Sequence, residues 1–181
     1  MNTGQMLTVL FALGLLSTVT LGVNSMLVNK TETMLEAEAS LTAISLAQTM
    51  IDEVQTKAYD MYTANGGKVY DSTGFTAASS LGASSSELAA VPQPERPDTA
   101  SPYKSIKYFN DVDDYQNYRR YAYTTMGVFK ITDTVYYVSE SNPDVKSTTQ
   151  TFYKKIIITV THPNMKYPLK LSDVAVYRRY F

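Results

Sequence analysis

The sequence predicts an α+β protein in which a long N-terminal helix packs on a small C-terminal antiparallel β-sheet. Three observations predict this fold class: residues 1–29 contain no charged side chain, residues 31–60 contain neither Pro nor Gly, and 11 of the 15 tyrosines lie after residue 103. An uninterrupted apolar and then amphipathic run is typical of a helix, whereas Tyr and β-branched residues favour strands. The chain of 181 residues is long enough for one such domain.

The first element is a hydrophobic helix within residues 1–29. Residues 6–28 form a run of 23 mostly apolar residues, and about 20 such residues cross a bilayer as a helix. The run also contains Thr and Ser residues, whose hydroxyls we expect to bond back to the helix backbone. We therefore interpret residues 1–29 as a membrane-embedded helix.

A cleaved secretory signal is the alternative interpretation of this run. Such signals have a basic segment, a shorter apolar core and a small-x-small cleavage site, but the first four residues here include no Lys or Arg. The first charge is Lys30, followed by Glu32, Glu36 and Glu38. This acidic flank favours an arrangement with the N-terminus inside.

Residues 30–60 are predicted to continue the helix as an amphipathic half. Apolar side chains recur at three-, four- and seven-residue intervals, which indicates one apolar stripe. Its members are Ala37, Leu41, Ile44, Ala47, Ile51, Val54 and Ala58. Glu53 is among the charged residues that we place on the other faces. A helix from about residue 5 to residue 60 would be about 80 Å long. A domain of this size cannot cover such a rod, so its N-terminal half must lie in lipid or against other copies.

Residues 61–103 are predicted to form a long Ser-, Gly- and Pro-rich loop. Gly66–Gly67, Ser84–Ser86 and four prolines between residues 92 and 102 interrupt any regular pattern. One short element is expected near residues 87–90. A loop of this length marks either a functional surface loop or a solvated linker.

Residues 104–181 are predicted to form the antiparallel sheet. Residues 129–138, 152–161 and 169–180 are rich in β-branched and aromatic residues and are separated by turn-forming segments; residues 119–125 are a further candidate strand. This part carries 12 Lys and Arg against seven acids, whereas residues 30–60 carry two against six. The acidic helix face and the basic sheet could therefore attract each other, within a subunit or between subunits.

The order of these segments resembles type IV pilins and pseudopilins, in particular the minor pilins of the mannose-sensitive hemagglutinin type. Four short strings carry the resemblance. They are AQTMIDEV leading to AYD at residues 47–60, NDVDDY at residues 110–115, KIIITVT at residues 155–161 and LKLSDVAVY at residues 169–177. The resemblance implies a filament subunit whose N-terminal helix is held in the membrane before assembly.

The N-terminus departs from the pilin pattern. Prepilins carry a basic leader and a Gly before the cleavage point, and the resemblance places that junction between Gly4 and Gln5. Cleavage there would put Val9 where most pilins have a Glu. In the family, this Glu is thought to pair with the N-terminal amine of a neighbouring subunit. Some pseudopilins located at the filament tip also lack it, which is compatible with a minor or initiating subunit.

Two sets of charged residues are candidate binding sites. Asp111, Asp113 and Asp114 could offer oxygen ligands to a cation, but the EF-hand spacing fails because Gln116 and Ala122 occupy the positions of its Gly and Glu. We favour a structural turn or a salt-bridge cluster. The pairs Arg119–Arg120 and Arg178–Arg179 are predicted to lie at solvated strand edges.

Composition argues against several other functions. The formal net charge is -1, the chain has no Cys and only one His, and no Gly-rich phosphate loop or nucleophile elbow occurs. We expect no nucleic-acid partner. We also expect no enzymatic activity, and no metal or cofactor, because no set of side chains assembles a reactive site.

The sequence therefore favours a structural subunit of a type IV pilus-like filament or secretion pseudopilus, assembled with copies of itself or with other pilin-like subunits. The expected packing residues are Ala37, Leu41, Ile44, Ala47, Ile51 and Val54. The expected location is the inner membrane before assembly, then an extracellular filament or a periplasmic pseudopilus. The alternative is a membrane-anchored binding module with a single span that does not polymerise.

Overall fold

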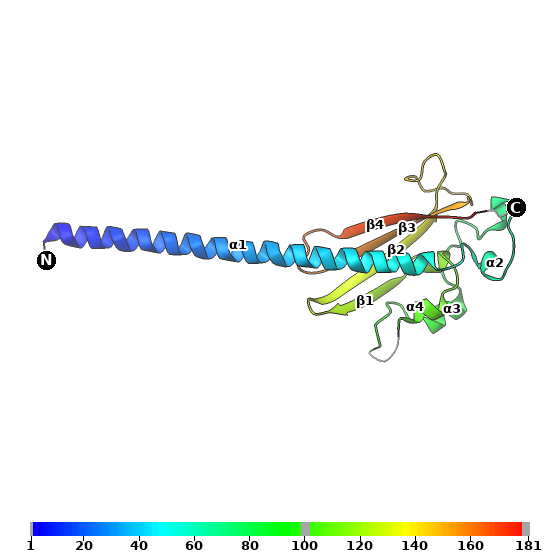
Figure 1. Ribbon diagram of the computed structural model, residues 1–181, viewed down its shortest axis with the longest axis horizontal. Helices are drawn as coiled ribbons and strands as arrows, with labels where there is room; N and C mark the ends of the chain where they lie inside the picture. The colour runs from blue at the N-terminus through cyan, green and yellow to red at the C-terminus, as the bar shows by residue number, and fades with distance from the viewer. Residues whose placement is uncertain (1, 99–101, 179–181) are drawn as a thin grey trace.

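The computed structural model describes residues 2–98 and 102–178. Helix α1 (Thr3–Gln55) runs along one face of a four-stranded sheet and extends far beyond it toward the N-terminus (Figure 1). The strands are β1 (Arg119–Thr124), β2 (Gly127–Tyr137), β3 (Tyr153–Thr161) and β4 (Leu169–Val176). The predicted α+β fold, with a long helix packed on a small antiparallel sheet, is confirmed.

Helix α1 ends at Gln55, about five residues before the predicted end. Ala58 and Asp60, which follow this end, form hydrogen bonds outside α1. The amide of Ala58 donates to the carbonyl of Asn110 over 3.2 Å, and the carbonyl of Ala58 accepts from Val112 over 2.9 Å. Asp60 begins the short helix α2 (Met61–Ala64), because its carboxylate accepts from the amide of Tyr62. The long-range contacts of Ala58 and the local cap at Asp60 replace the next turn of α1.

The sheet is a simple meander in the order β1-β2-β3-β4, with every neighbouring pair antiparallel. All four predicted strands are present, including the additional one at residues 119–125. In β2 the side chains of odd-numbered residues from Phe129 to Tyr137 are buried, whereas the even-numbered ones are exposed or half-buried. This alternation places one face of the sheet against the helix.

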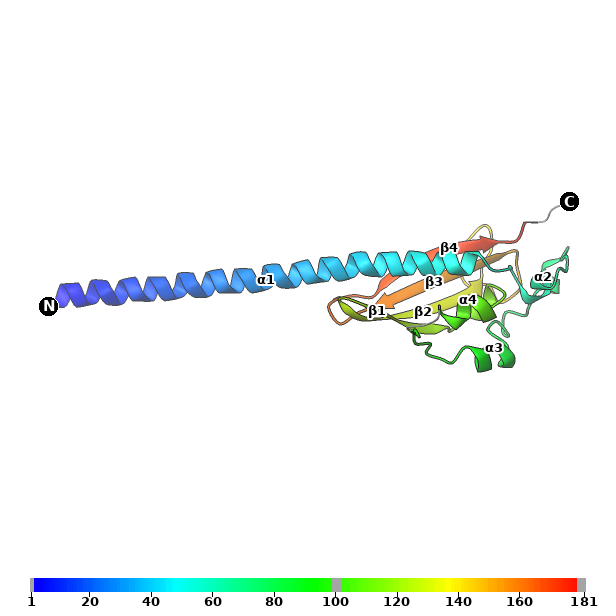
Figure 2. The ribbon, with the colours of Figure 1, turned by 60° about the horizontal axis from the view of Figure 1, so that its bottom comes forward.

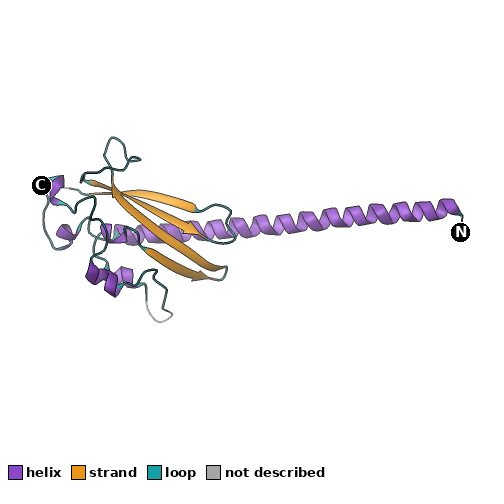
Figure 3. Ribbon diagram, turned by 180° about the vertical axis from the view of Figure 1, so that it is seen from behind, coloured by secondary structure: helices purple, strands orange, loops and turns teal. Residues whose placement is uncertain are grey.

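The core lies between α1 and this sheet face. Figure 2 shows the C-terminal part of α1 lying over the strands, and Figure 3, from behind, shows the opposite face without a helix over it. The helix contributes small or slender side chains and the sheet contributes larger ones. They are Ala39, Ala43, Ala47, Met50 and Val54 from α1, and Phe129, Ile131, Val135, Ile156, Ile158 and Val160 from β2 and β3.

The segment between α1 and the sheet contains more ordered structure than the sequence indicated. The expected short element is α3 (Ser85–Ala90), begun by a capping box between Ser84 and Glu87. The segment also includes a 3₁₀ turn at Ser72–Gly74, and α4 (Lys104–Tyr108) and a 3₁₀ turn at Asp113–Tyr115 follow before β1. Val69 and Phe75 join Tyr59 and Tyr137 in a second small core, which fixes the segment to the end of the sheet.

Candidate assembly site

The N-terminal half of α1 is an apolar surface that nothing else in the described chain covers. None of the residues in its most apolar 18-residue window is buried, and this helix is long and apolar enough to cross a membrane. The large side chains of Phe11, Leu21 and Met26 are 71%, 70% and 71% exposed, respectively. Burial of such a continuous surface requires lipid or another protein helix.

Four hydroxyl groups of this half form hydrogen bonds with the helix backbone, as predicted for its Thr and Ser residues. The hydroxyls of Thr8, Ser17, Thr18 and Thr20 donate to backbone carbonyls three or four residues earlier, over distances of 2.8–3.1 Å. A hydroxyl that donates within its own helix does not need water. The Ser and Thr residues are therefore compatible with an apolar environment.

The predicted stripe divides into two sides of α1. Ala47, Ile51 and Val54 are buried against the sheet, but Leu41 is 69% exposed and Ile44 is 47% exposed. Ala37 is exposed as well. The sheet of the same chain therefore covers Ala47, Ile51 and Val54 and leaves Ala37, Leu41 and Ile44 uncovered. The sheet instead covers Ala39 and Ala43, which lie on the neighbouring side of the helix. The role of all six residues in assembly stays a prediction.

The three exposed members of the stripe, together with Met34, form a ridge. It is here called the outer ridge and consists of Met34, Ala37, Leu41 and Ile44. Their spacing of three, four and three residues keeps them on one side of the helix. Met34 is 61% exposed. The outer ridge continues the apolar surface of residues 6–28 toward the sheet, so the uncovered apolar surface extends beyond the membrane-length segment.

The candidate cleavage junction lies in the first turn of α1. Gly4 and Gln5 are helical and exposed, and the amide of Gln5 donates to the carbonyl of Asn2 over 2.8 Å. Val9, at the position of the family's Glu, is 50% exposed. Cleavage at this junction stays a prediction.

A buried ion pair fixes the docked part of α1 to the sheet. Nη1 of Arg120, in β1, lies 2.6 Å from Oε2 of Glu53, and both side chains are nearly inaccessible. Oε1 of Glu53 accepts from Ser105 over 2.8 Å and from the Tyr115 hydroxyl over 2.9 Å. Burial, and then the charge of Glu53, raise the pKa of Tyr115, which keeps its hydroxyl a donor. The Arg120 guanidinium also stacks on Tyr103, 4.2 Å from the ring centre.

This pair corrects two predictions. Arg120 is buried rather than at a solvated edge, whereas its neighbour Arg119 is exposed as predicted. Glu53 is buried against the sheet rather than on an exposed face. The expected attraction between the acidic helix and the basic sheet thus operates within the subunit at this pair. Arg178 is exposed, and Arg179 lies outside the described residues.

The three aspartates form a buried turn joined to a buried lysine. Oδ1 of Asp111 accepts from the amides of Asp113 and Asp114, and Oδ2 of Asp114 accepts from the amides of Asn110 and Asp111. Burial raises the pKa of Asp111 to about 9, and the nearby charge of Asp113 adds to this rise. Burial likewise raises the pKa of Asp114 to about 6. The structural interpretation of the cluster accounts for these contacts.

Lys154, in β3, is the centre of this network. It is fully buried, its ammonium lies 2.6 Å from Oδ1 of Asp113 and 3.3 Å from Oδ2 of Asp60, and it donates to the carbonyl of Tyr59 over 2.6 Å. It also lies 4.5 Å from the Tyr59 ring centre. The network therefore connects the segment after α1, the aspartate turn and the sheet. Among the described residues, no group of three or more His, Asp or Glu could hold a metal ion.

Sequence reasoning did not single out Arg120, Lys154 or Asp133 as core residues. Each occupies a strand position that alternates with exposed or half-buried residues, on the same side as Ala122, Ile156 and Ile131 respectively. Strict two-residue alternation could have located them. Their partners could not be located in this way, because they lie far away in the sequence.

The chain was compared with models of protein families, with curated proteins and with solved structures, and none of these comparisons finds a match.

Proposed function

We propose that this chain is a structural subunit of a type IV pilus-like filament or a secretion pseudopilus. The observation that carries the proposal is the uncovered apolar surface of α1, which continues from residues 6–28 through the outer ridge. Lipid accounts for the first part of this surface but not for the outer ridge, which begins about 9 Å beyond Val28 at a rise of 1.5 Å per residue.

In the proposed assembly, α1 leaves the membrane and packs against α1 of neighbouring subunits. Removal from lipid is offset because neighbouring copies bury the same apolar surface. The outer ridge has the three- and four-residue spacing that helices use to interlock with other helices. The sheet domain remains outside this helical bundle, since the ion pair of Glu53 with Arg120 keeps it on the other side of the helix.

The proposed location follows from this mechanism. Before assembly the chain resides in the inner membrane, with residues 30–181 on the outer side, and afterwards it is part of an extracellular filament or periplasmic pseudopilus. Its partners are copies of itself or other pilin-like subunits. No step in this mechanism requires catalysis or a cofactor.

The experiment is a comparison of Ile44→Asp with Glu38→Gln in producing cells. Ile44 is 47% exposed and belongs to the outer ridge, so a carboxylate there should leave the subunit folded but abolish packing between helices. Glu38→Gln, on an exposed position outside the ridge, should leave filament yield unchanged. The measurement is electron microscopy of sheared surface material with an antibody to residues 104–181.

The outcomes separate the proposal from the anchored-module alternative. Folded Ile44→Asp protein that stays in the membrane, together with normal filaments from Glu38→Gln, supports assembly through the outer ridge. If unmodified protein never leaves the membrane in cells that carry other pilin-like polymers, the chain is an anchored module instead. Intact-mass analysis of the same material tests the junction, because cleavage after Gly4 leaves Gln5 as the first residue.

A further inference from the structure

The charged residues of β1 to β4 are segregated between the two faces of the sheet. Successive side chains of a strand point to opposite faces. The acids of the strands are Asp133, which is buried on the face toward α1, and Asp173, whose carboxylate accepts from Gln55 of α1. The opposite face, here called the free face, carries four strand cations and no strand acid. These cations are Arg119, Lys130, Lys155 and Lys170.

Three cations of the free face are open to an external anion. Figure 3 shows this face without a helix over it. Arg119, Lys130 and Lys170 are exposed, and no ion pair within residues 2–98 and 102–178 includes any of them. Lys155 differs, because it pairs with Asp144 of the β2–β3 loop over 2.6 Å.

An open hollow of about 400 Å³ lies beside Arg119. Asn117, which precedes β1, and Thr132 and Thr134 of β2 also line it. Asn117 has a left-handed backbone with φ of 63°, which Asn tolerates better than most residues, and it is exposed. The hollow therefore combines a guanidinium group with an amide and two hydroxyls.

The other two residues that line this hollow do not oppose an anion. Tyr118 and Asp133 are both buried, and each is 2% exposed. Burial raises the pKa of Asp133 well above its usual value, so its carboxyl favours the neutral form.

Cations and hydroxyls continue across the sheet from the hollow. One row of the strand register consists of Arg119, Thr132, Thr159 and Lys170. Because neighbouring strands lie about 4.8 Å apart, the backbones of Arg119 and Lys170 are about 14 Å from each other. Lys130 lies two residues before Thr132 in β2. A single ligand with several negative charges can therefore contact all three cations.

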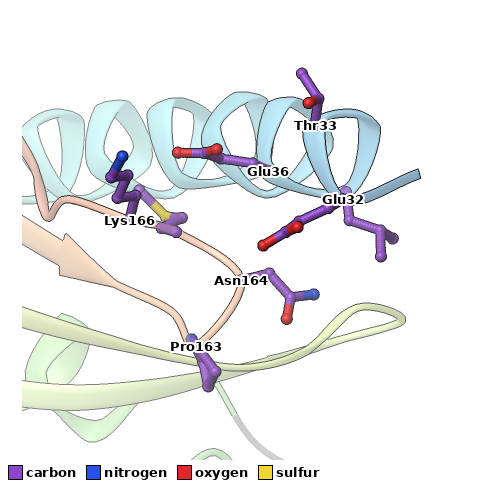
Figure 4. Close-up of a pocket in the computed structure, with 8 residues that line it drawn as sticks. Glu32, Thr33, Glu36, Pro163, Asn164 and Lys166 are labelled. Atoms are coloured by element: carbon purple, nitrogen blue, oxygen red, sulfur yellow. The ribbon is translucent and has the colours of Figure 1, made fainter. Parts of the chain in front are cut away.

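The side of the domain next to α1 has a different charge pattern. A hollow of about 500 Å³ lies there between α1 and residues 163–166, and it is lined by Glu32 and Glu36 as well as Lys166 (Figure 4). Two carboxylates and one ammonium group do not favour an anion. The charge pattern therefore directs an anionic ligand to the free face.

The aromatic rings of the free face favour a polysaccharide over a single-stranded nucleic acid. Nucleic-acid strands bind where bases stack on open rings. Tyr121 instead lies under the guanidinium of Arg96, 5.8 Å from the ring centre, while Tyr136 and Tyr153 are half-buried. Tyr123 is 58% exposed but stands at the end of β1 away from the hollow. Hydroxyls and an amide beside cations match the hydroxyls and carboxylates of acidic sugars.

We propose that the free face binds an acidic polysaccharide whose sugars carry carboxylates. One carboxylate meets Arg119 in the hollow through two parallel hydrogen bonds, and Asn117 and Thr132 bond to hydroxyls of the same sugar. Lys130 and Lys170 meet further carboxylates of the polymer. This binding goes beyond the proposed assembly. The free face is turned away from α1, so packing through α1 leaves it accessible, and many copies in one filament bind one polymer more tightly than a single copy does.

The test uses the full chain dispersed in the uncharged detergent dodecyl maltoside, so that binding does not depend on assembly. Binding to immobilised polygalacturonate is measured at low salt, and added salt should weaken it. The same polymer with methyl-esterified carboxylates is the matched ligand control, because esterification removes the charge and keeps the sugar chain. Single-stranded oligo(dT) is the nucleic-acid probe.

The test variant is Lys130→Gln/Lys170→Gln, and the control variant is Lys68→Gln/Lys166→Gln. All four lysines are exposed, so both variants should fold and both lose two positive charges, but only the first pair lies on the free face. We expect the test variant to bind polygalacturonate roughly tenfold more weakly than the unmodified protein, whereas the control variant keeps its affinity. Circular dichroism verifies the fold of each.

Equal binding of the charged and the esterified polymer would overturn the proposal without any variant. Equal losses of affinity in the two double variants would overturn it as well, because binding would then follow net charge alone. Tighter binding of oligo(dT) than of polygalacturonate would identify a nucleic-acid surface instead. Each of these outcomes leaves assembly through α1 intact, and a failure to form filaments in cells would not affect this binding.

Discussion

Arg119 and Arg120 are neighbours in β1 and have opposite environments. Arg119 is exposed, whereas Arg120 is 3% exposed and holds Glu53 against the sheet. Alternation along a strand produces this difference, because successive side chains point to opposite faces. The buried member of the pair connects β1 to the helix.

We expect Arg120→Leu to destabilise the fold by about 3–5 kcal/mol, because it leaves the carboxylate of Glu53 buried without its cation. Arg119→Ala should change the free energy of unfolding by less than about 0.5 kcal/mol. Urea unfolding of the full chain in mild detergent, followed by circular dichroism, measures both. Similar effects of the two substitutions would contradict the role assigned to the ion pair.

Asp133 is a second buried acidic residue, and no hydrogen bond from the described residues reaches its carboxyl group. Both of its carboxylate oxygens are inaccessible and without a hydrogen bond, and the residue lies between Ile131 and Val135 on the helix-facing side of β2. Burial raises its pKa well above the usual value, although Arg120 opposes this rise. The folded state therefore favours the protonated carboxyl.

This raised pKa predicts a loss of stability as pH rises. Above the unfolded pKa of about 4, the unfolded chain releases the Asp133 proton while the folded chain retains it, so rising pH favours unfolding until the folded pKa is passed. Asp133→Asn should remove this contribution and stabilise the protein at pH 8 by about 1 kcal/mol or more. Asp111 and Asp114 titrate in both proteins, so the difference between their pH–stability profiles isolates Asp133. If the pH–stability profiles of the two proteins were parallel, Asp133 would not be the cause of the stability loss at rising pH.

At the scale of elements, the docking of α1 depends on three alanines spaced four residues apart. Ala39, Ala43 and Ala47 are fully buried against the sheet. Small side chains allow a helix to approach its partner closely. The sequence pattern concealed this face, because Leu41 and Ile44 are larger and dominated the apolar stripe.

We expect Ala43→Leu to destabilise the docked state by about 1–3 kcal/mol, because three additional carbons must fit into a filled contact. Ala37→Leu introduces the same change on the exposed outer ridge and should leave the stability of the subunit nearly unchanged. Thermal unfolding in detergent distinguishes them. A large loss of stability from Ala37→Leu, with none from Ala43→Leu, would show that the outer ridge is the face that packs on the sheet.

Local sequence signals predicted some elements of the fold and not others. The four strands were predictable because β-branched residues and turn segments are local signals. The end of α1 could not be located from Ala58, because its hydrogen bonds with Asn110 and Val112 join positions far apart in the sequence. Asp60 is a favoured N-cap residue and its bond with the Tyr62 amide is local, so the sequence did contain a signal for the start of α2. Periodicity indicated an apolar stripe on the helix but not which side the sheet would cover.

At the scale of the whole molecule, the hydrophobic half of α1 is separable from the domain. A fragment lacking residues 1–29 retains the buried face of α1, the ion pair with Arg120 and the Lys154 network. We expect it to be folded, soluble and monomeric, because it lacks the long apolar surface on which the proposed assembly depends. Analytical ultracentrifugation and circular dichroism measure this. Polymers of the fragment would indicate that sheet edges join the subunits.

Between Val28 and Ala39, helix α1 contains no Pro or Gly and continues without a break from its apolar half to its docked half. No hinge therefore separates the domain from the apolar half of α1, and the domain moves with the helix as a rigid body. About 40 Å of helix separates Val28 from Gln55, so a tilt of about 20° displaces the far end sideways by about 14 Å. Rotation of α1 about its axis likewise turns the whole domain. Anything that binds the apolar N-terminal half of α1 thus decides which way the domain faces, without touching the domain itself.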